Sequence, residues 1–145
     1  MTEAILDTNV LVRQLTGAPQ DIALRARALL ESAQHLGMEL LVSPVVLAEI
    51  VYVLQSFYRW NREDIANGLL AVASGSALLV LEQSVVIDAL TRYRDTRGLD
   101  FADAYVAALA VARGHGNVMS FDRDFRRLAG ITIIDDPSQL GSTGA

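Results

Sequence analysis

Short apolar runs alternate with longer helical segments along the chain, and this alternation restricts the fold more than any other feature of the sequence. Most of the runs lack a regular exchange of polar and apolar side chains, which is typical of strands in a parallel sheet with both faces covered. The pattern therefore predicts an α/β fold with a central parallel β-sheet of about five strands, flanked by helices on both faces. The predicted strands are Ala4–Asp7, Glu39–Ser43, Leu78–Leu81, Asn117–Ser120 and Ile131–Ile134.

The helical segments between these runs carry recognisable start signals. Ser43 is followed by Pro44, a capping serine before a proline at the first helical position, and this pair predicts a helix that ends near Phe57. Asn61 is expected to cap the next helix in the same way. The predicted helices are 23–34, 44–57, 62–73, 84–96 and 101–113, the last ended by a Gly-His-Gly turn.

The length of 145 residues fits one domain with its own core. We expect this domain to span residues 1–140 and residues 141–145 to form a disordered tail. No run of about 18 uncharged apolar residues is present that would span a bilayer. The N-terminal segment lacks the basic region of a signal peptide, so we expect a cytoplasmic protein.

The residue types that are missing exclude several kinds of chemistry. The sequence contains no cysteine, which rules out disulfides, thiol nucleophiles and cysteine-bound zinc. All twelve basic residues are arginine, so mechanisms that require a lysine, such as P-loop nucleotide hydrolysis, are also excluded. The net charge of −5 argues against non-specific coating of nucleic acid.

Binding to RNA would have to rely on local groups of arginines. Two such groups are candidates, and each is interpreted equally well as a solvated helix face. They are Arg92, Arg94 and Arg97, and Arg123, Arg126 and Arg127.

Two acidic residues follow predicted strands. Asp7 ends the first strand, and Asp122 comes two residues after the fourth. In open parallel sheets, ligands bind beyond the carboxyl ends of the strands, which is where both residues fall. For Asp7 the alternative is simple capping of the next helix. Asp124 lies farther into an arginine-rich turn, so we expect it to face solvent or to support the site indirectly.

Glu49 and Asp103 lie within predicted helices. Glu49 interrupts the most apolar helix of the chain, so we expect partial burial and a partner, either an arginine or a metal ion. Asp103 occupies the first turn of an alanine-rich helix, where acids commonly favour the helix dipole. Asp100 is expected to cap that helix, which leaves Asp103 less well explained.

Four carboxylates gathered at one place would repel one another by about 4 kcal/mol for a pair at 4 Å and an effective dielectric constant near 20. A cation would offset this repulsion. Oxygen ligands without cysteine or histidine suit Mg²⁺ or Mn²⁺, which activate water and stabilise phosphate chemistry. The spacing of the residues does not by itself bring the four carboxylates together.

Four segments of the chain resemble the PIN-domain family, most closely its VapC toxin branch. Ala4–Leu11 resembles the apolar strand followed by Asp-Thr-Asn, and Val46–Glu49 resembles the helical glutamate of the family. Leu99–Ala104 is similar to the Asp-x-x-Asp-Ala segment before an alanine-rich helix. Met119–Phe125 is similar to the Thr-x-Asp-x-x-Phe motif, with Ser120 in place of the commoner threonine. These segments occur in the family's order over nearly the whole chain.

The resemblance implies a PIN-domain fold and a hydrolase, namely an Mg²⁺- or Mn²⁺-dependent endoribonuclease that acts as the toxin of a toxin-antitoxin pair. It implies that the metal ligands, direct or through water, are Asp7, Glu49, Asp103 and Asp122, and that Asn9, Ser120 and Asp100 are supporting residues. It further implies RNA as substrate, a cognate antitoxin that occupies the site, and a homodimer.

Two alternatives differ in class from a nuclease. A PIN-like RNA-binding or interaction module without activity would lack one of the acids, but none of the four is missing. A phosphatase or receiver domain that phosphorylates its first-strand aspartate would use a lysine, which this chain does not contain.

The remaining candidates are histidines and aromatic residues. His35 and His115 are expected to be surface residues. The aromatic residues near the end of the 44–57 helix are interpreted mainly as core, with a dimer or antitoxin interface as the alternative. They are Tyr52, Phe57, Tyr58 and Trp60.

Overall fold

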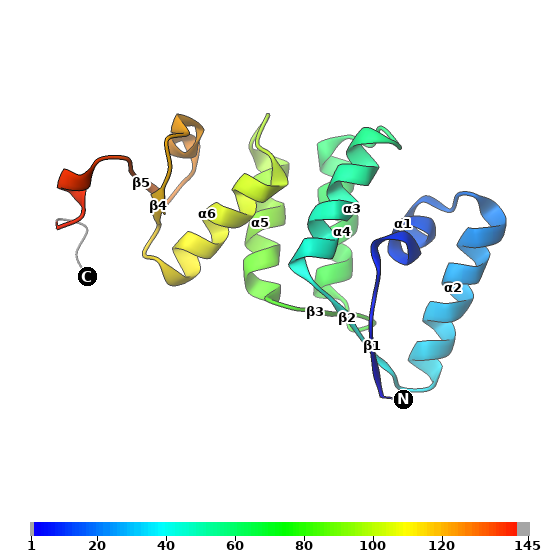
Figure 1. Cartoon of the computed structure of the whole chain (residues 1–145). Coiled ribbons are helices and arrows are strands. Elements are labelled where there is room, and N and C mark those ends of the chain that lie inside the picture. Colours follow the sequence, from blue (N-terminus) through cyan, green and yellow to red (C-terminus); the bar gives the residue numbers. More distant parts are fainter. Residues whose placement is uncertain (1, 142–145) are drawn as a thin grey trace. The chain divides into compact units, whose positions relative to one another are not determined.

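The computed structural model describes residues 2–141 and divides into two compact units, Met1–Gln83 and Ser84–Ala145. We call them the N-terminal and the C-terminal unit (Figure 1). The expectation of a single domain over residues 1–140 stays a prediction. Of the predicted tail, Gly141 is an exposed turn residue, and residues 142–145 lie outside the described part.

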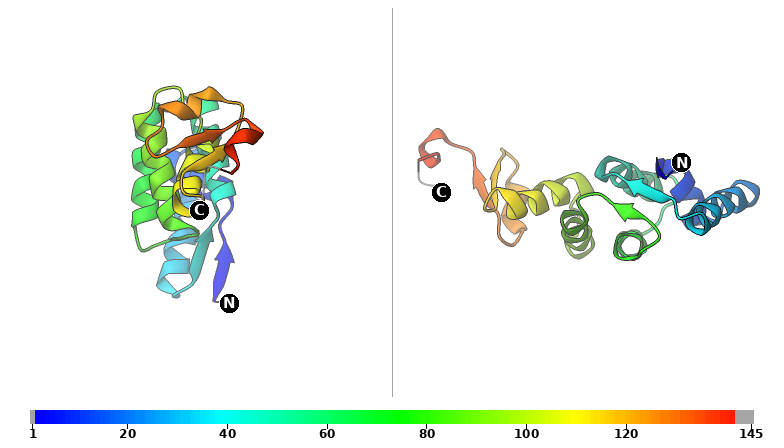
Figure 2. Two further views of the ribbon diagram at one scale, coloured as in Figure 1. Left: turned by 90° about the vertical axis from the view of Figure 1, so that its left-hand side faces the viewer. Right: turned by 90° about the horizontal axis from the view of Figure 1, so that it is seen from below.

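The N-terminal unit is built on a three-stranded parallel sheet in the order β1-β2-β3. Its strands are β1 (Glu3–Ile5), β2 (Glu39–Val42) and β3 (Leu79–Val80). Ile5 is in register with Leu41, and Leu41 with Leu79. The arrows of β1 and β2 point the same way in Figure 2. The carboxyl ends of the strands therefore lie at one edge of this sheet.

Helices complete this unit and bury its core. They are α1 (Thr8–Thr16), α2 (Gln20–His35), α3 (Pro44–Ser56) and α4 (Arg62–Ser74). Ser43 and Asn61 cap α3 and α4 through their side chains, as predicted. The apolar faces of α3 and α4 supply fully buried leucines and isoleucines at positions 47, 50, 54, 65 and 69. Burial of such side chains stabilises the unit by about 1.5–3 kcal/mol each.

Helix α1 was expected only as the helix that Asp7 would cap, without bounds of its own. It is short and ends at Gly17, whose φ of +68° gives the left-handed cap that glycine adopts most readily. It packs on both α2 and α3, and its buried residues Leu11 and Val12 fix it there. The helix therefore depends on tertiary packing rather than on its own propensity.

The C-terminal unit contains two helices and a parallel pair of strands. Its elements are α5 (Gln83–Asp95, of which the first residue belongs to the N-terminal unit), α6 (Phe101–Arg113), β4 (Asn117–Met119), η1 (Arg123–Arg127), β5 (Thr132–Ile134) and η2 (Pro137–Gln139). Tyr93 and Phe101 meet edge to face, with ring centroids 6.2 Å apart, and join α5 to α6. Every strand pair in the two units is parallel, which confirms the predicted α/β class.

A close backbone approach follows α6. Gly116 has a φ of +82°, and a side chain there would overlap the carbonyl oxygen of Gly130. The carbonyl of Gly116 accepts a hydrogen bond from the N–H of Thr132 at 2.8 Å. Glycine at this turn therefore lets β5 lie beside β4.

Among the described residues 2–141, no helix is long and apolar enough to cross a membrane.

Candidate metal centre

Asp7 stands at the carboxyl end of β1, directly before α1. It takes the N-cap position, with φ −89° and ψ 157°, but its side chain makes no capping hydrogen bond. The carboxylate is exposed. The capping alternative for Asp7 therefore fails for its side chain, which leaves both oxygens free for a ligand.

Glu49 lies close to the residue that follows Asp7. The hydroxyl of Thr8 donates a hydrogen bond to Oε2 of Glu49 at 3.0 Å. Thr8 is 6% exposed and is the only buried polar residue in the described part of the chain. Its hydroxyl thus holds one carboxylate oxygen in place and leaves the other free.

The expected partial burial of Glu49 is wrong, because Glu49 is exposed. Only one side of α3 packs against the core, through Leu47, Ile50, Val51 and Leu54. Glu49 lies on the other side with Val45 and Tyr52, which are also exposed. An apolar sequence around the helix therefore did not mean burial on all sides.

A cavity of about 190 Å³ opens beside these acids within the N-terminal unit. Its walls include Asp7, Thr8, Asn9, Arg13, Glu49 and Tyr58. The guanidinium of Arg13 donates hydrogen bonds to the hydroxyl of Tyr58 at 3.0 Å and to the carbonyl of Ala18 at 3.3 Å. Two carboxylates and one fixed cation thus line the same hollow.

Sequence reasoning had not assigned Thr8, Arg13 and Tyr58 to the site. The pattern that would have indicated Thr8 is a hydroxyl directly after a strand-end aspartate. Arg13 lies one helical turn after Asn9 and so shares its side of α1, a spacing that is readable from the sequence. Tyr58 lies 45 residues away from Arg13, and only the tertiary fold brings the two together.

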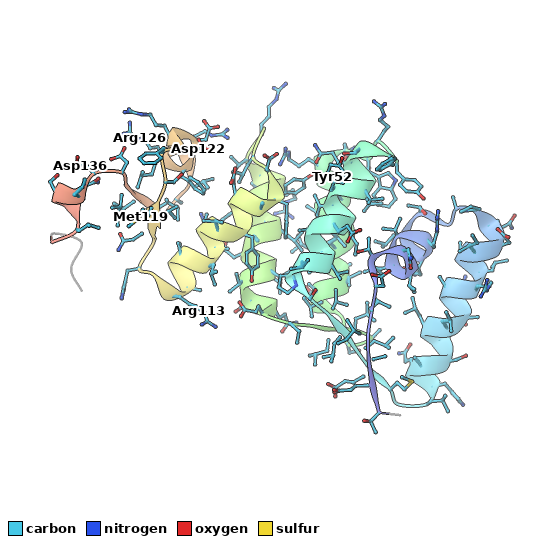
Figure 3. All side chains as sticks on the ribbon, in the orientation of Figure 1. Tyr52, Arg113, Met119, Asp122, Arg126 and Asp136 are labelled. Carbon is cyan, nitrogen blue, oxygen red and sulfur yellow. The ribbon has the colours of Figure 1, made fainter. Side chains whose placement is uncertain are left out.

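In the C-terminal unit, Asp122 follows β4 and is held by short-range hydrogen bonds. Its backbone N–H donates to Oγ of Ser120 at 2.9 Å, and its Oδ1 accepts from the backbone N–H of Asp124 at 2.9 Å. Asp122 and Arg126 lie near each other on the η1 side of this unit in Figure 3. One carboxylate oxygen of Asp122 is therefore engaged in the cap of η1, and the other is free.

Asp103 lies in the first turn of α6 and is half-buried. Partial burial raises the pKa of its carboxyl group, and the negative charges of Asp100, Asp122 and Asp124 raise it further. These four acids of the C-terminal unit therefore share one region of negative potential. Such a region favours a cation.

The expected capping role of Asp100 is wrong for its side chain. Asp100 occupies the N-cap position of α6 with extended backbone angles, but its carboxylate accepts no hydrogen bond from the helix. The side chain is exposed and adds its charge to the field at Asp103 instead. Asn9, also exposed, has no hydrogen bond among the described residues, so its orienting role stays a prediction.

The two arginine groups differ in how they are paired. Arg92 binds Asp88 at 3.0 Å and the carbonyl of Ala129 at 2.9 Å, while Arg94 binds Asp95 at 2.8 Å and lowers the pKa of that carboxyl group. These contacts favour the structural interpretation for the first group.

The second arginine group keeps more of its charge available. Arg127 donates to the carbonyl of Arg97 at 2.8 Å. Arg123 and Arg126 are exposed and have no partner within residues 2–141. Two cations of this group therefore remain free to bind phosphate.

Both histidines are exposed, as predicted. Among the aromatic residues, Tyr52 and Phe57 are 62% and 72% exposed and meet edge to face, which makes the core interpretation wrong for this pair. Figure 3 labels Tyr52 on α3. Trp60 is half-buried and its ring lies over Gly68. The interface alternative therefore concerns Tyr52 and Phe57 more than Trp60.

The donor set of the site fits a hard divalent cation. The candidate donors within each unit are carboxylate oxygens, which suit Mg²⁺ or Mn²⁺ rather than zinc or copper. Within residues 2–141, no three acidic or histidine side chains are arranged so that they would hold an ion.

Parallel strands with helices between them, and acids after the first and fourth strands, define an α/β protein with a strand-end acidic site. The chain belongs to the PIN domain family, whose model matches residues 4–131. It is 30% identical over 129 residues to a VapC ribonuclease of Aquifex aeolicus (strain VF5), a match that covers 89% of this chain and 94% of that protein. No solved structure gives a significant match.

Proposed function

We propose that this protein is an Mg²⁺- or Mn²⁺-dependent endoribonuclease that hydrolyses RNA phosphodiester bonds. The ligands are Asp7, Glu49, Asp103 and Asp122, directly or through water. The observation that carries the proposal concerns Asp7, which stands at a strand end in a PIN domain. It occupies the N-cap position of α1, but its side chain makes no capping hydrogen bond. Similarity to a VapC ribonuclease over most of the chain supports RNA as the substrate.

A divalent ion bound by these carboxylates would lower the pKa of a water molecule and neutralise charge on the phosphate. The chain's own residues prepare the site. Thr8 orients Glu49 through the 3.0 Å hydrogen bond, so the Glu49 side chain loses less conformational freedom when a metal ion binds. Ser120 fixes the backbone at Asp122 in the same manner.

Asp122 is the ligand we expect to act through water. Its Oδ1 is engaged by the backbone N–H of Asp124, so one oxygen remains for the ion or for an intervening water molecule. Arg13 carries a charge beside Asp7 and Glu49, where it would bind a phosphate oxygen of the substrate.

The decisive experiment replaces Asp7 by Asn and measures Mg²⁺-dependent cleavage of single-stranded RNA. We expect activity to be abolished while the circular dichroism spectrum and the melting temperature remain those of the wild type, because the side chain is exposed and makes no capping hydrogen bond. Asp21→Asn, an exposed first-turn acid of α2, is the matched control and should retain full activity. Near-normal cleavage by Asp7→Asn would refute the assignment.

We further propose that the nuclease is the toxin of a toxin-antitoxin pair in the cytoplasm, with a cognate antitoxin that occupies the site. Expression in a bacterial host should arrest growth, and Asp7→Asn should relieve the arrest. Co-expression with a cognate antitoxin should also relieve the arrest. Growth that is unaffected by the active protein would remove the toxin role and leave the nuclease.

A homodimer is the remaining part of the proposal, and the exposed pair on α3 is its candidate interface. We expect the solution mass to be that of a dimer, and Tyr52→Glu to reduce it to that of a monomer. Trp60→Glu is the comparison, because Trp60 is half-buried and should affect the dimer less. A monomeric wild type would contradict the dimer.

A further inference from the structure

Phe121 is the most exposed large apolar residue in the described part of the chain, at 91%. It stands between Ser120 and Asp122, and the backbone N–H of Asp122 donates a hydrogen bond to Oγ of Ser120 at 2.9 Å across it. An aromatic ring exposed to water lacks the ~1.5–3 kcal/mol of stabilisation that its burial would give. The ring is therefore exposed directly beside a proposed metal ligand.

A cavity of about 280 Å³ lies beside Phe121 within the C-terminal unit. Its apolar walls are Met119, Ile134, Pro137 and Leu140, of which Met119 is 74% exposed and Leu140 54%. Met119 and Asp136, both labelled in Figure 3, line this cavity. The hollow is thus lined by side chains that gain from contact with a flat apolar ligand.

The wall of this cavity is fixed by hydrogen bonds. The Oε1 atom of Gln139 accepts from the backbone N–H groups of Asp135 and Asp136, at 2.9 and 2.8 Å, and its Nε2 donates to the carbonyl of Ile133 at 2.9 Å. Asp136 in turn accepts from the backbone N–H and the hydroxyl of Ser138, which lowers the pKa of its carboxyl group. The hollow is therefore preformed.

Two arginines follow the ring along the chain, in the same segment as Asp122 and Asp124. Arg123 and Arg126 are exposed, and neither has a partner within residues 2–141. An aromatic platform next to unpaired arginines is the combination that binds single-stranded nucleic acid, since bases stack on the ring and phosphates pair with the cations.

We propose that Phe121 and the adjoining cavity form a base-binding subsite, in which one unpaired RNA base stacks on Phe121 while Arg123 and Arg126 bind the flanking phosphates. The inference rests on the proposed ribonuclease function and deepens it. Because stacking and apolar contact recognise the flat face that every base has, the subsite requires a base but discriminates weakly among the four.

The test measures binding without cleavage, in EDTA, by the fluorescence anisotropy of two labelled twelve-residue probes. One is oligoadenylate, and the other is an abasic ribose-phosphate chain of the same charge. Phe121→Ala should weaken binding of oligoadenylate by about 5- to 150-fold, the range for loss of one stacked base, and leave the abasic probe unaffected. Phe121→Tyr should bind oligoadenylate like the wild type. Arg126→Gln should weaken binding of both probes equally. It should also make the affinity less dependent on salt concentration, by the amount expected for about one phosphate contact.

Leu36→Ala is the matched control, because Leu36 is also exposed, at 76%, but lies in the N-terminal unit and outside the candidate dimer interface. It should not change the affinity for either probe. The inference is overturned if Phe121→Ala binds oligoadenylate as the wild type does, if it loses equal affinity for both probes, or if its effect is a change in solution mass, which would mark a protein interface.

The two proposals fail separately. Wild-type cleavage of RNA together with unchanged binding by Phe121→Ala would remove the subsite and keep the nuclease. If the wild-type protein does not cleave RNA but Phe121→Ala weakens its base-dependent binding, the nuclease proposal fails and the subsite stands.

Discussion

The hydrogen bond from Thr8 to Glu49 is the contact from which the proposed metal centre can be tested most directly. Thr8→Val keeps the shape of the side chain and removes the hydroxyl that donates to Oε2 at 3.0 Å. Loss of a residue that orients a metal ligand costs about 10- to 100-fold in metal affinity, or about 1.4–2.7 kcal/mol. Glu49 is exposed, so water replaces part of the lost contact and we expect a loss of about tenfold.

The same substitution should have little effect on folding. Thr8 is 6% exposed, and a methyl group in place of its hydroxyl remains in apolar surroundings. The exposed carboxylate of Glu49 is solvated once its partner is removed, so no buried polar atom is left unsatisfied. The free energy of unfolding should therefore change by less than about 1 kcal/mol.

Isothermal titration with Mn²⁺ measures the affinity, and urea unfolding in EDTA measures the stability. Thr8→Ser restores the hydroxyl and should recover most of the affinity. Mn²⁺ affinity of Thr8→Val equal to that of the wild type would refute the orienting role. A loss of affinity that only accompanies a loss of stability would refute it as well.

Two further predictions concern the C-terminal unit. The pKa of Asp103 is raised in the folded protein, so the charged carboxylate opposes folding once the pH rises above its ordinary titration range. Without metal, Asp103→Asn should therefore raise the free energy of unfolding at pH 7 and flatten the decline of that free energy as the pH rises through this range. A less stable Asp103→Asn in EDTA would contradict this. Gly116→Ala introduces a methyl group that overlaps the carbonyl of Gly130, and it also forces alanine into a positive φ. The free energy of unfolding, measured with urea, should fall by about 2–5 kcal/mol. Gly98→Ala has a similar φ and open space around it, and should cost only about 1–2 kcal/mol; equal costs would exclude the overlap.

The elements of the fold were predictable wherever a local signal decided them. Ser43 and Asn61 cap the helices that their side chains predicted, and the predicted helix 101–113 is α6 with the same bounds. The bounds of helix α1 were not predicted, because its nine residues form through packing on α2 and α3 rather than through propensity.

The positions of the candidate acids along the elements could be predicted from the sequence, but their contacts could not. Strand-end acids are visible in a sequence, because the carboxyl end of a parallel strand is a known place for ligands. The exposure of Glu49 was not visible, since an apolar helix does not reveal which of its sides is packed. The free side chain of Asp100 was hidden for a similar reason: the N-cap position can be read from sequence, but the direction of the carboxylate cannot.

By itself, the sequence determined the α/β class and the family and excluded thiolate ligands, because periodicity, motif order and the absence of cysteine are properties of the chain alone. Only the tertiary structure decided that Thr8 holds Glu49 across 41 residues and that Phe121 stands in solvent beside Asp122. The physical reason is that hydrogen bonds and burial depend on which surfaces meet in space. That choice is made by the packing of whole elements and not by the local sequence.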